Sequence, residues 1–235
     1  MDNKITVGIH QPNFMPWLGY FYKIFQSDIF IFLDDVQLQK TGASYTNKVT
    51  INIKNKSHSL VIPIKRSSGF WTIKETSFAN NQWKKKIIGS LQANYAKAPY
   101  FKEHKEFVFG LINFESNNLS EYNIYFITEI SKKLDLHTKF IKSSDMPTSL
   151  TSTSRLIYLI QQVQGNIYIS GSGGDNYQDK KLYEENNIEL IYTEYPKFNY
   201  SQYLTPNFIE GLSIIDAIFN LGIDRLKKIY FRKGQ

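Results

Sequence analysis

The sequence predicts an α/β protein with a Rossmann-like, mostly parallel sheet, a helical insertion and a small β-hairpin region. Short apolar runs alternate with segments of helical apolar spacing at both ends of the chain, as in strand–helix–strand units. Polar or glycine-rich residues follow several of these runs. The 235 residues, 42% of them hydrophobic, suffice for one sizeable core. We therefore expect a single α/β domain over residues 1–235.

The first unit of this domain lies near the N-terminus. An apolar run at residues 5–9 predicts a strand, and a run at residues 29–33 predicts a second one. Between them, Pro16-Trp17 opens a segment with apolar residues at helical spacing. Strand, helix and strand in this order predict two parallel strands with a crossover helix.

Residues 48–64 predict a β-hairpin. Two apolar runs, at residues 48–53 and 59–64, flank a turn at Asn55-Lys56. We expect one more strand at residues 71–78.

A helical insertion is expected at about residues 80–135. Helical patterns cover residues 81–96, a segment that starts at Pro99, and residues 119–134. Three helices without an intervening strand break the simple alternation, so we expect them to form an insertion or a cap over the sheet.

The alternation of strands and helices resumes after residue 137. Strands are expected at residues 138–142, 166–170 and 188–193. Helices are expected at residues 155–163, 181–186 and 213–221. The last helix ends at Gly222, a residue type favoured directly after a helix.

Composition narrows the classes of function. The chain has no cysteine, which excludes disulfides, thiol catalysis and thiolate metal sites. A net charge of +7 is compatible with an ordinary solvated surface and also favours anionic partners, such as a nucleotide-linked substrate, an acidic carrier protein or a membrane surface. No zinc-finger or RNA-binding signature predicts nucleic acid binding. Without a predicted signal peptide or membrane span, we expect a cytoplasmic protein.

Polar residues at the ends of the first two strands form the first candidate site. His10 follows one strand, and Asp34 and Asp35 follow the other. The carboxyl ends of parallel strands line the ligand crevice of α/β sheets. A neutral His10 suits a general base, with Asp35 or Asp34 as its orienting acceptor. A structural histidine beside a turn-capping aspartate explains the same residues, and three hard ligands without a spacing signature do not predict a metal site.

A glycine-rich loop after the strand at residues 166–170 is the second candidate. Such a loop between a strand and a helix presents backbone N–H groups to a phosphate or carboxylate. It lacks the Lys-Ser/Thr pair of a P-loop and the GxGxxG spacing, so a plain turn is the alternative. Its candidate binding residues are Ser170, Gly171, Gly173, Gly174 and Tyr177.

Aromatic residues in the long segment at residues 195–206 and just before it form the third candidate. They suit stacking on a sugar or a base, or packing of the segment onto the domain. These residues are Tyr192, Tyr195, Phe198, Tyr200 and Tyr203. Asp216, at the start of the last helix, has a position favoured by the helix dipole.

Four segments spread along the chain resemble the WbqC-like family. They are HQPNFMPWLGYFYKIFQSDIFIFLDDVQ at residues 10–37, LVIPIK at 60–65, YISGSGGDNY at 168–177 and LSIIDAIFNLG at 212–222. The resemblance covers nearly the whole chain, and the first segment is long and specific. One departure is that the Asn-Arg-Asn stretch of the family corresponds here to Tyr45-Thr46-Asn47. If the arginine binds an anion, Lys48 or Lys40 has to replace it.

The resemblance implies a role in bacterial surface-polysaccharide biosynthesis, including O-antigen. An N-acyltransferase that acts on a nucleotide-linked amino sugar fits such a pathway. Acyl-CoA or an acyl carrier protein would then supply the thioester, and transfer would be direct, with Ser170 as the alternative acyl carrier. His10 would be the base. The other expected substrate contacts in the first part of the chain are Gln11, Asn13, Trp17, Tyr20, Gln37, Asn47 and Lys48.

Two alternatives belong to other classes. The first unit also resembles the entry to HIGH-type nucleotidylyltransferases and ligases, which implies ATP at the glycine-rich loop. The second histidine of that motif corresponds here to Tyr20. The other alternative is a non-catalytic module that binds a sugar nucleotide. The sequence leaves open the reaction, the sugar, the acyl donor and the oligomeric state.

Overall fold

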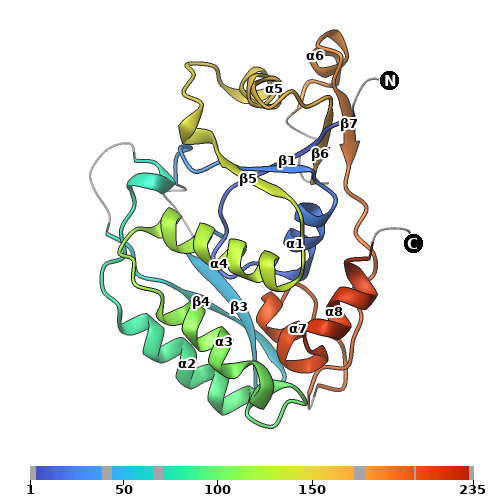
Figure 1. Ribbon diagram of the computed structural model, residues 1–235. Coiled ribbons are helices and arrows are strands. Elements are labelled where there is room, and N and C mark those ends of the chain that lie inside the picture. The colour runs from blue at the N-terminus through green and yellow to red at the C-terminus, as the bar shows by residue number, and fades with distance from the viewer. Residues whose placement is uncertain (1–3, 39–43, 66–70, 172–177, 204, 233–235) are drawn as a thin grey trace.

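Five parallel strands form the central sheet of the computed structural model, which describes residues 4–38, 44–65, 71–171, 178–203 and 205–232. The strands are β1 (Thr6–His10), β2 (Ile29–Phe32), β5 (Lys139–Lys142), β6 (Ile167–Ser170) and β7 (Glu189–Tyr192). Their order across the sheet is β5-β2-β1-β6-β7 (Figure 1). The predicted α/β, Rossmann-like fold is therefore confirmed.

The strand order places a topological switch point between β1 and β6. The chain starts in the middle of the sheet, builds outward through β2 to β5, and then returns to the other side of β1 with β6 and β7. Pairing between β1 and β2 continues to His10↔Phe32, but pairing between β1 and β6 ends at Gly8↔Ile169. The two central strands therefore part at their carboxyl ends, which is where ligands bind in folds of this class.

Helices cover both faces of the sheet. On one face lie α1 (Leu18–Phe25) and α4 (Leu119–Lys133), and on the other lie α5 (Ser152–Gln162) and α6 (Lys180–Glu185) (Figure 1). Alternation along β1 directs Val7 and Ile9 into the smaller core under α5 and α6. The larger core joins α1 and α4 to the remaining helices and to the hairpin.

The hairpin consists of β3 (Lys48–Ile53) and β4 (Lys56–Val61), which pair in antiparallel register. Its two-residue turn, Lys54-Asn55, has positive φ angles of 50° and 63°, as tight hairpins require. Because of this turn, β4 begins at Lys56, three residues before the start of the predicted strand at residues 59–64. The hairpin itself is confirmed.

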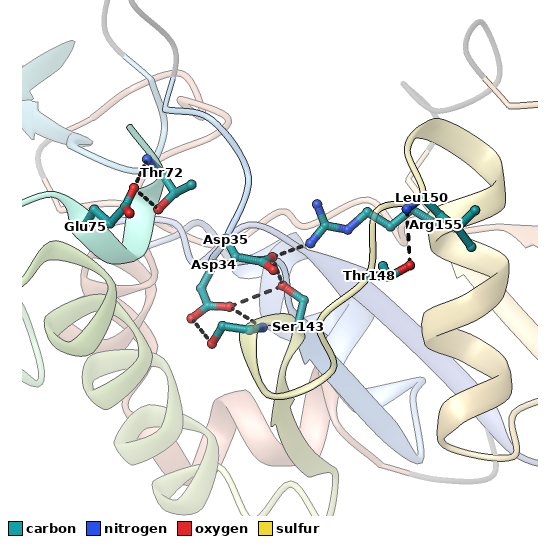
Figure 2. A network of polar contacts seen from close by, with 9 residues as sticks. Asp34, Asp35, Thr72, Glu75, Ser143, Thr148, Leu150 and Arg155 are labelled. Carbon is teal, nitrogen blue, oxygen red and sulfur yellow. Dashed lines mark hydrogen bonds and ion pairs between the residues drawn. The ribbon is translucent and has the colours of Figure 1, made fainter. Parts of the chain in front are cut away.

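Two helices, α2 (Gln82–Tyr95) and α3 (Phe101–Asn113), precede α4 within the helical region that the sequence predicts. The strand predicted at residues 71–78 is wrong. That segment contains a turn of 3-10 helix, η1 (Ile73–Glu75), because Thr72 and Glu75 form a capping box. The Glu75 carboxylate accepts from the backbone N–H and the hydroxyl of Thr72 (Figure 2).

The chain ends in α7 (Ile214–Leu221) and α8 (Ile223–Tyr230), joined at Gly222 with φ 76°. The sequence predicts α7 but not α8. Among the described residues, none of the helices has both the length and the apolar character needed to cross a membrane.

Candidate active site at the switch point

His10 lies at the carboxyl end of β1, half-buried against Tyr20 of α1. The two rings meet edge to face with centroids 5.0 Å apart. The Nδ1 atom of His10 is 3.1 Å from the backbone carbonyl of Gln11, which also accepts the Tyr20 hydroxyl at 2.9 Å. A carbonyl can only accept, so this contact requires a proton on Nδ1 and leaves Nε2 with the lone pair. His10 is thereby oriented as a base whose free nitrogen is Nε2.

The environment of His10 favours its neutral form. Burial, and then the positive charge of Lys23, lower the pKa of His10 to about 4. At neutral pH the imidazole is uncharged and able to accept a proton.

Lys23 extends from α1 into the gap where β1 and β6 part. Its Nζ donates to the backbone carbonyl of Ile9 at 2.8 Å, and the side chain is only 2% exposed. Ile5 accepts from Ile167 of β6, and a period of two along β1 directs the Ile9 carbonyl toward β6 as well. The Lys23 ammonium therefore occupies the place where the next bond of the ladder would form.

The charge of Lys23 has no carboxylate partner among the described residues. Burial lowers the pKa of Lys23 to about 7, so the amine changes charge near neutral pH. A buried ammonium is costly unless an anion or several acceptors compensate it. This arrangement makes Lys23 the residue best placed to attract an anionic ligand to the switch point.

Sequence reasoning missed Lys23 because it lies within a helix of apolar character. A signal was nevertheless present, since Lys23 is the only Lys, Arg, Asp or Glu between Lys4 and Asp28. A single charge in so long an apolar stretch indicates either an exposed helix edge or a buried charge.

The end of β6 faces this gap. Ser170 is buried, and its hydroxyl accepts from Gln178 at 2.9 Å and donates to the Gly171 carbonyl at 3.2 Å. Gln178 thus holds the end of the strand. The predicted ligands Gly173, Gly174 and Tyr177 lie outside the described residues.

The two carboxylates after β2 bind other partners. Asp34 is 2% exposed and accepts from the Ser144 backbone N–H at 3.0 Å and from its hydroxyl at 2.8 Å. Asp35 accepts from the Ser143 hydroxyl and pairs with Arg155 of α5 (Figure 2). The two serines belong to a 3-10 turn, η2 (Ser143–Asp145), that follows β5.

This network links β2, η2 and α5, and no hydrogen bond among the described residues joins either carboxylate to His10. The acceptor that orients His10 is the Gln11 carbonyl, in place of the aspartate expected from the sequence.

The remaining predicted contacts are spread over two regions. Asn47 donates to the Ile62 carbonyl at 3.2 Å, and Lys48 lies 4.2 Å from the ring centre of Tyr45, so both belong to the hairpin side. Gln37 is exposed beyond the aspartates, and Asn13 is buried. Trp17 contacts Tyr195, with ring centres 5.1 Å apart. Close to His10, the structure brings together Gln11 and Tyr20 from the predicted set, and Lys23 in addition.

A metal centre has no visible basis in the described part of the chain, where no group of three or more His, Asp or Glu side chains is placed to hold an ion. At the switch point, the described side chains offer an imidazole base and a cationic amine beside the carboxyl ends of two strands.

Comparison with known proteins gives one family and one relative. The model of the WbqC-like protein family matches residues 11–228. Uncharacterized protein Rv1507c of Mycobacterium tuberculosis (strain ATCC 25618 / H37Rv) is 29% identical over 220 residues, which cover 93% of this chain and 94% of that protein. No solved structure matches the chain. Because the family match extends from the end of β1 into α8, the chain belongs to the WbqC-like protein family.

Proposed function

We propose that the protein is an N-acyltransferase of bacterial surface-polysaccharide biosynthesis. It would transfer an acyl group from a thioester donor, acyl-CoA or an acyl carrier protein, to the amine of a nucleotide-linked amino sugar in the cytoplasm. The observation that carries this proposal is the combination, at the switch point, of a neutral His10 and a buried Lys23 that has no carboxylate partner in the described part of the chain.

The nucleotide part of the substrate is supported by the fold and the charge. Doubly wound sheets bind nucleotides where their strand order reverses, here between β1 and β6. The helices α1 and α5 each follow a strand of the sheet, so their N-terminal ends face this same edge. Together with Lys23 they make the edge favourable for a phosphate group.

The transfer step is supported by the orientation of His10. The amine of the sugar attacks the thioester carbonyl, and its proton passes to Nε2 of His10. The tetrahedral intermediate then collapses and its carbon–sulfur bond breaks. His10 returns the proton to the departing thiolate, which leaves as a thiol. His10 is unchanged at the end, as a general base and acid must be.

Lys23 links substrate binding to this step. Its charge is one cause of the low pKa of His10, so an anion bound beside Lys23 offsets that charge. The pKa of His10 then rises toward working pH, where the imidazole is a stronger base.

The direct test is a ligand and product screen on the full chain. We expect nucleotide-linked amino sugars and acyl-CoA thioesters to raise the melting temperature, and mass spectrometry to detect the N-acylated sugar. The matched control is the corresponding nucleotide sugar with a hydroxyl in place of the amine, which should bind without being acylated. Binding of ATP alone, with neither thioester nor amino sugar stabilising the protein, would contradict the proposal.

A nucleotide-transferring enzyme is the second candidate, favoured by the strand order together with a histidine directly after β1. It predicts stabilisation by ATP and release of pyrophosphate in the presence of an acceptor. A non-catalytic binding module is the third possibility. It predicts that replacement of Lys23 weakens sugar-nucleotide binding, whereas replacement of His10 has no functional effect.

A further inference from the structure

We propose that an aromatic pocket beside the switch point binds the acyl chain of the donor. This inference rests on the proposed acyl transfer and adds the site that selects the acyl group. The pocket has a volume of about 260 Å³. Its walls come from the start of α1 and from the segment between β7 and α7, chiefly Trp17, Leu18, Tyr195, Phe198, Tyr200 and Phe208.

The rings frame the hollow without stacking. Trp17 and Tyr195 are tilted by 58°, Trp17 and Phe198 by 86°, and Tyr200 and Phe208 by 76°. Tilted and edge-to-face contacts join the rings at their borders, which leaves space between the walls.

The hydroxyl of Tyr200 forms its hydrogen bond with a residue outside the pocket. This hydroxyl donates to Oδ1 of Asp216 at 2.8 Å, and Tyr95 of α2 donates to Oδ2 of the same carboxylate at 2.8 Å. Asp216 is fully buried in α7, so this bond fixes the ring of Tyr200 as a rigid wall. Asp216 lies in the first turn of α7, as the expectation about the helix dipole requires, and it serves in addition as the anchor of Tyr200.

The lining chemistry favours an apolar chain over a sugar. Besides the rings, Leu18, Ile209 and Leu212 line the pocket, together with the charged residues Lys197 and Glu210. A sugar ring needs hydrogen-bond partners for several hydroxyls, and the two charged side chains of Lys197 and Glu210 are few for that number. A hydrocarbon chain has no such requirement and gains from burial.

The pocket lies next to the end of β6. An atom added at the Cβ position of Gly171 would be 3.9 Å from the hydroxyl oxygen of Tyr195. Gly8 pairs with Ile169, so the continuation of both strands sets Gly171 level with His10. A thioester carbonyl near His10 can therefore direct its chain past Gly171 toward Tyr195.

The test measures binding of N-acetylcysteamine thioesters with two, four, six and eight carbons in the acyl group. These probes carry the end that coenzyme A and acyl carrier protein share. We expect the dissociation constant to fall about fourfold per added methylene, which corresponds to about 0.8 kcal/mol, until the pocket is full.

Two variants should change, in opposite directions, the acyl chain length at which the pocket is full. Phe208→Ala enlarges the pocket and should favour longer chains, whereas Ile209→Trp fills it and should favour the shortest. The matched control is Phe107→Ala, which truncates another half-buried phenylalanine, on α3. It should leave the chain-length profile unchanged. Circular dichroism and thermal unfolding establish that each variant is folded.

A profile independent of chain length, or the same shift in both pocket variants, would overturn the pocket assignment. So would loss of sugar-nucleotide binding in Phe208→Ala while the acyl series stays flat, because the pocket would then hold the sugar. The failure of the proposed function looks different: chain-length selection would persist in these binding measurements while no amino sugar is acylated. Coenzyme A and carrier-protein donors are then distinguished by repeating the series with each.

Discussion

Two groups of polar side chains lie at the carboxyl edge of the same sheet, and their bonding differs. Asp34 and Asp35, after β2, are saturated by serines and by Arg155. Among the described residues, His10 of β1 and Lys23 of α1 each have a single backbone carbonyl as their hydrogen-bond partner. Saturated groups are parts of the scaffold, whereas sparsely bonded ones retain capacity for a ligand. Position at a strand end alone does not distinguish the two.

The replacement His10→Ala is the strongest test of this difference between the two groups. Loss of a general base should reduce kcat by about 10²- to 10⁴-fold, with little change in binding of the sugar nucleotide. Steady-state kinetics and calorimetric titration measure the two quantities. Full activity in this variant would remove His10 from the mechanism.

Lys23 should give the folding stability a pH dependence, because burial lowers its pKa in the folded protein. Its folded-state pKa of about 7 lies below the ordinary value of 10.5, so between these values the unfolded chain holds a proton that the folded protein has released. The contribution of Lys23 to stability should therefore rise with pH across this window, by about 2 kcal/mol from pH 7 to pH 9.

Urea unfolding at several pH values tests this prediction, and Lys23→Met should abolish the rise. Lys102→Met, which alters an exposed lysine on α3, is the matched control and should keep the profile of the unaltered protein. Equal slopes in both variants would assign the effect to another group.

Asp34 should behave as scaffold. Asp34→Ala removes both hydrogen bonds from Ser144 and leaves the partly buried N–H of that residue without its partner, so the free energy of unfolding should fall by about 3 kcal/mol. Asp145→Ala, which removes an exposed carboxylate of η2 paired with Lys142, should cost less than about 0.5 kcal/mol. Urea unfolding compares the two. A catalytic role for Asp34 would appear instead as lost turnover in a protein of normal stability.

The smallest effect is expected for Tyr20→Phe. The lost hydroxyl donates to the Gln11 carbonyl, so stability should fall by about 1 kcal/mol. His10 keeps its own contact with that carbonyl, and turnover should fall far less than in His10→Ala. A loss equal to that of His10→Ala would make Tyr20 a direct participant in the reaction.

The sequence predicted the scaffold of the site better than its chemistry. Hydrophobic periodicity is a local signal, and it located β1, α1 and β2 together with the position of His10 at the carboxyl edge of the sheet. The partners of His10 are non-local or main-chain groups. The Gln11 carbonyl has no side-chain signature, and Lys23 reaches its position only because β6, which follows more than a hundred residues later, separates from β1 after Gly8.

The errors at residues 71–78 and in α8 have local causes. Apolar and β-branched residues at 71–78 favour a strand, but the capping box of Thr72 and Glu75 turns the backbone. In α8, the buried residues Ile223, Leu226 and Tyr230 recur at helical spacing among charged residues, and Gly222 separates them from α7. Gly222 ends α7 and also precedes the first residue of α8. The sequence prediction treated this glycine only as the end of a helix.

The central position of β1 has a consequence for synthesis on the ribosome. Its partner β6 is separated from it by 161 residues along the chain, as the bond from Ile5 to Asn166 shows. At about 5–20 residues per second, the β6 side of β1 waits about 8–30 s before its partner emerges. Distant pairing of this kind is slow to form and exposes an unpaired strand edge meanwhile. The place where Lys23 will lie is thus among the last parts of the sheet to close, and a nascent chain stopped before β6 has no switch point at all.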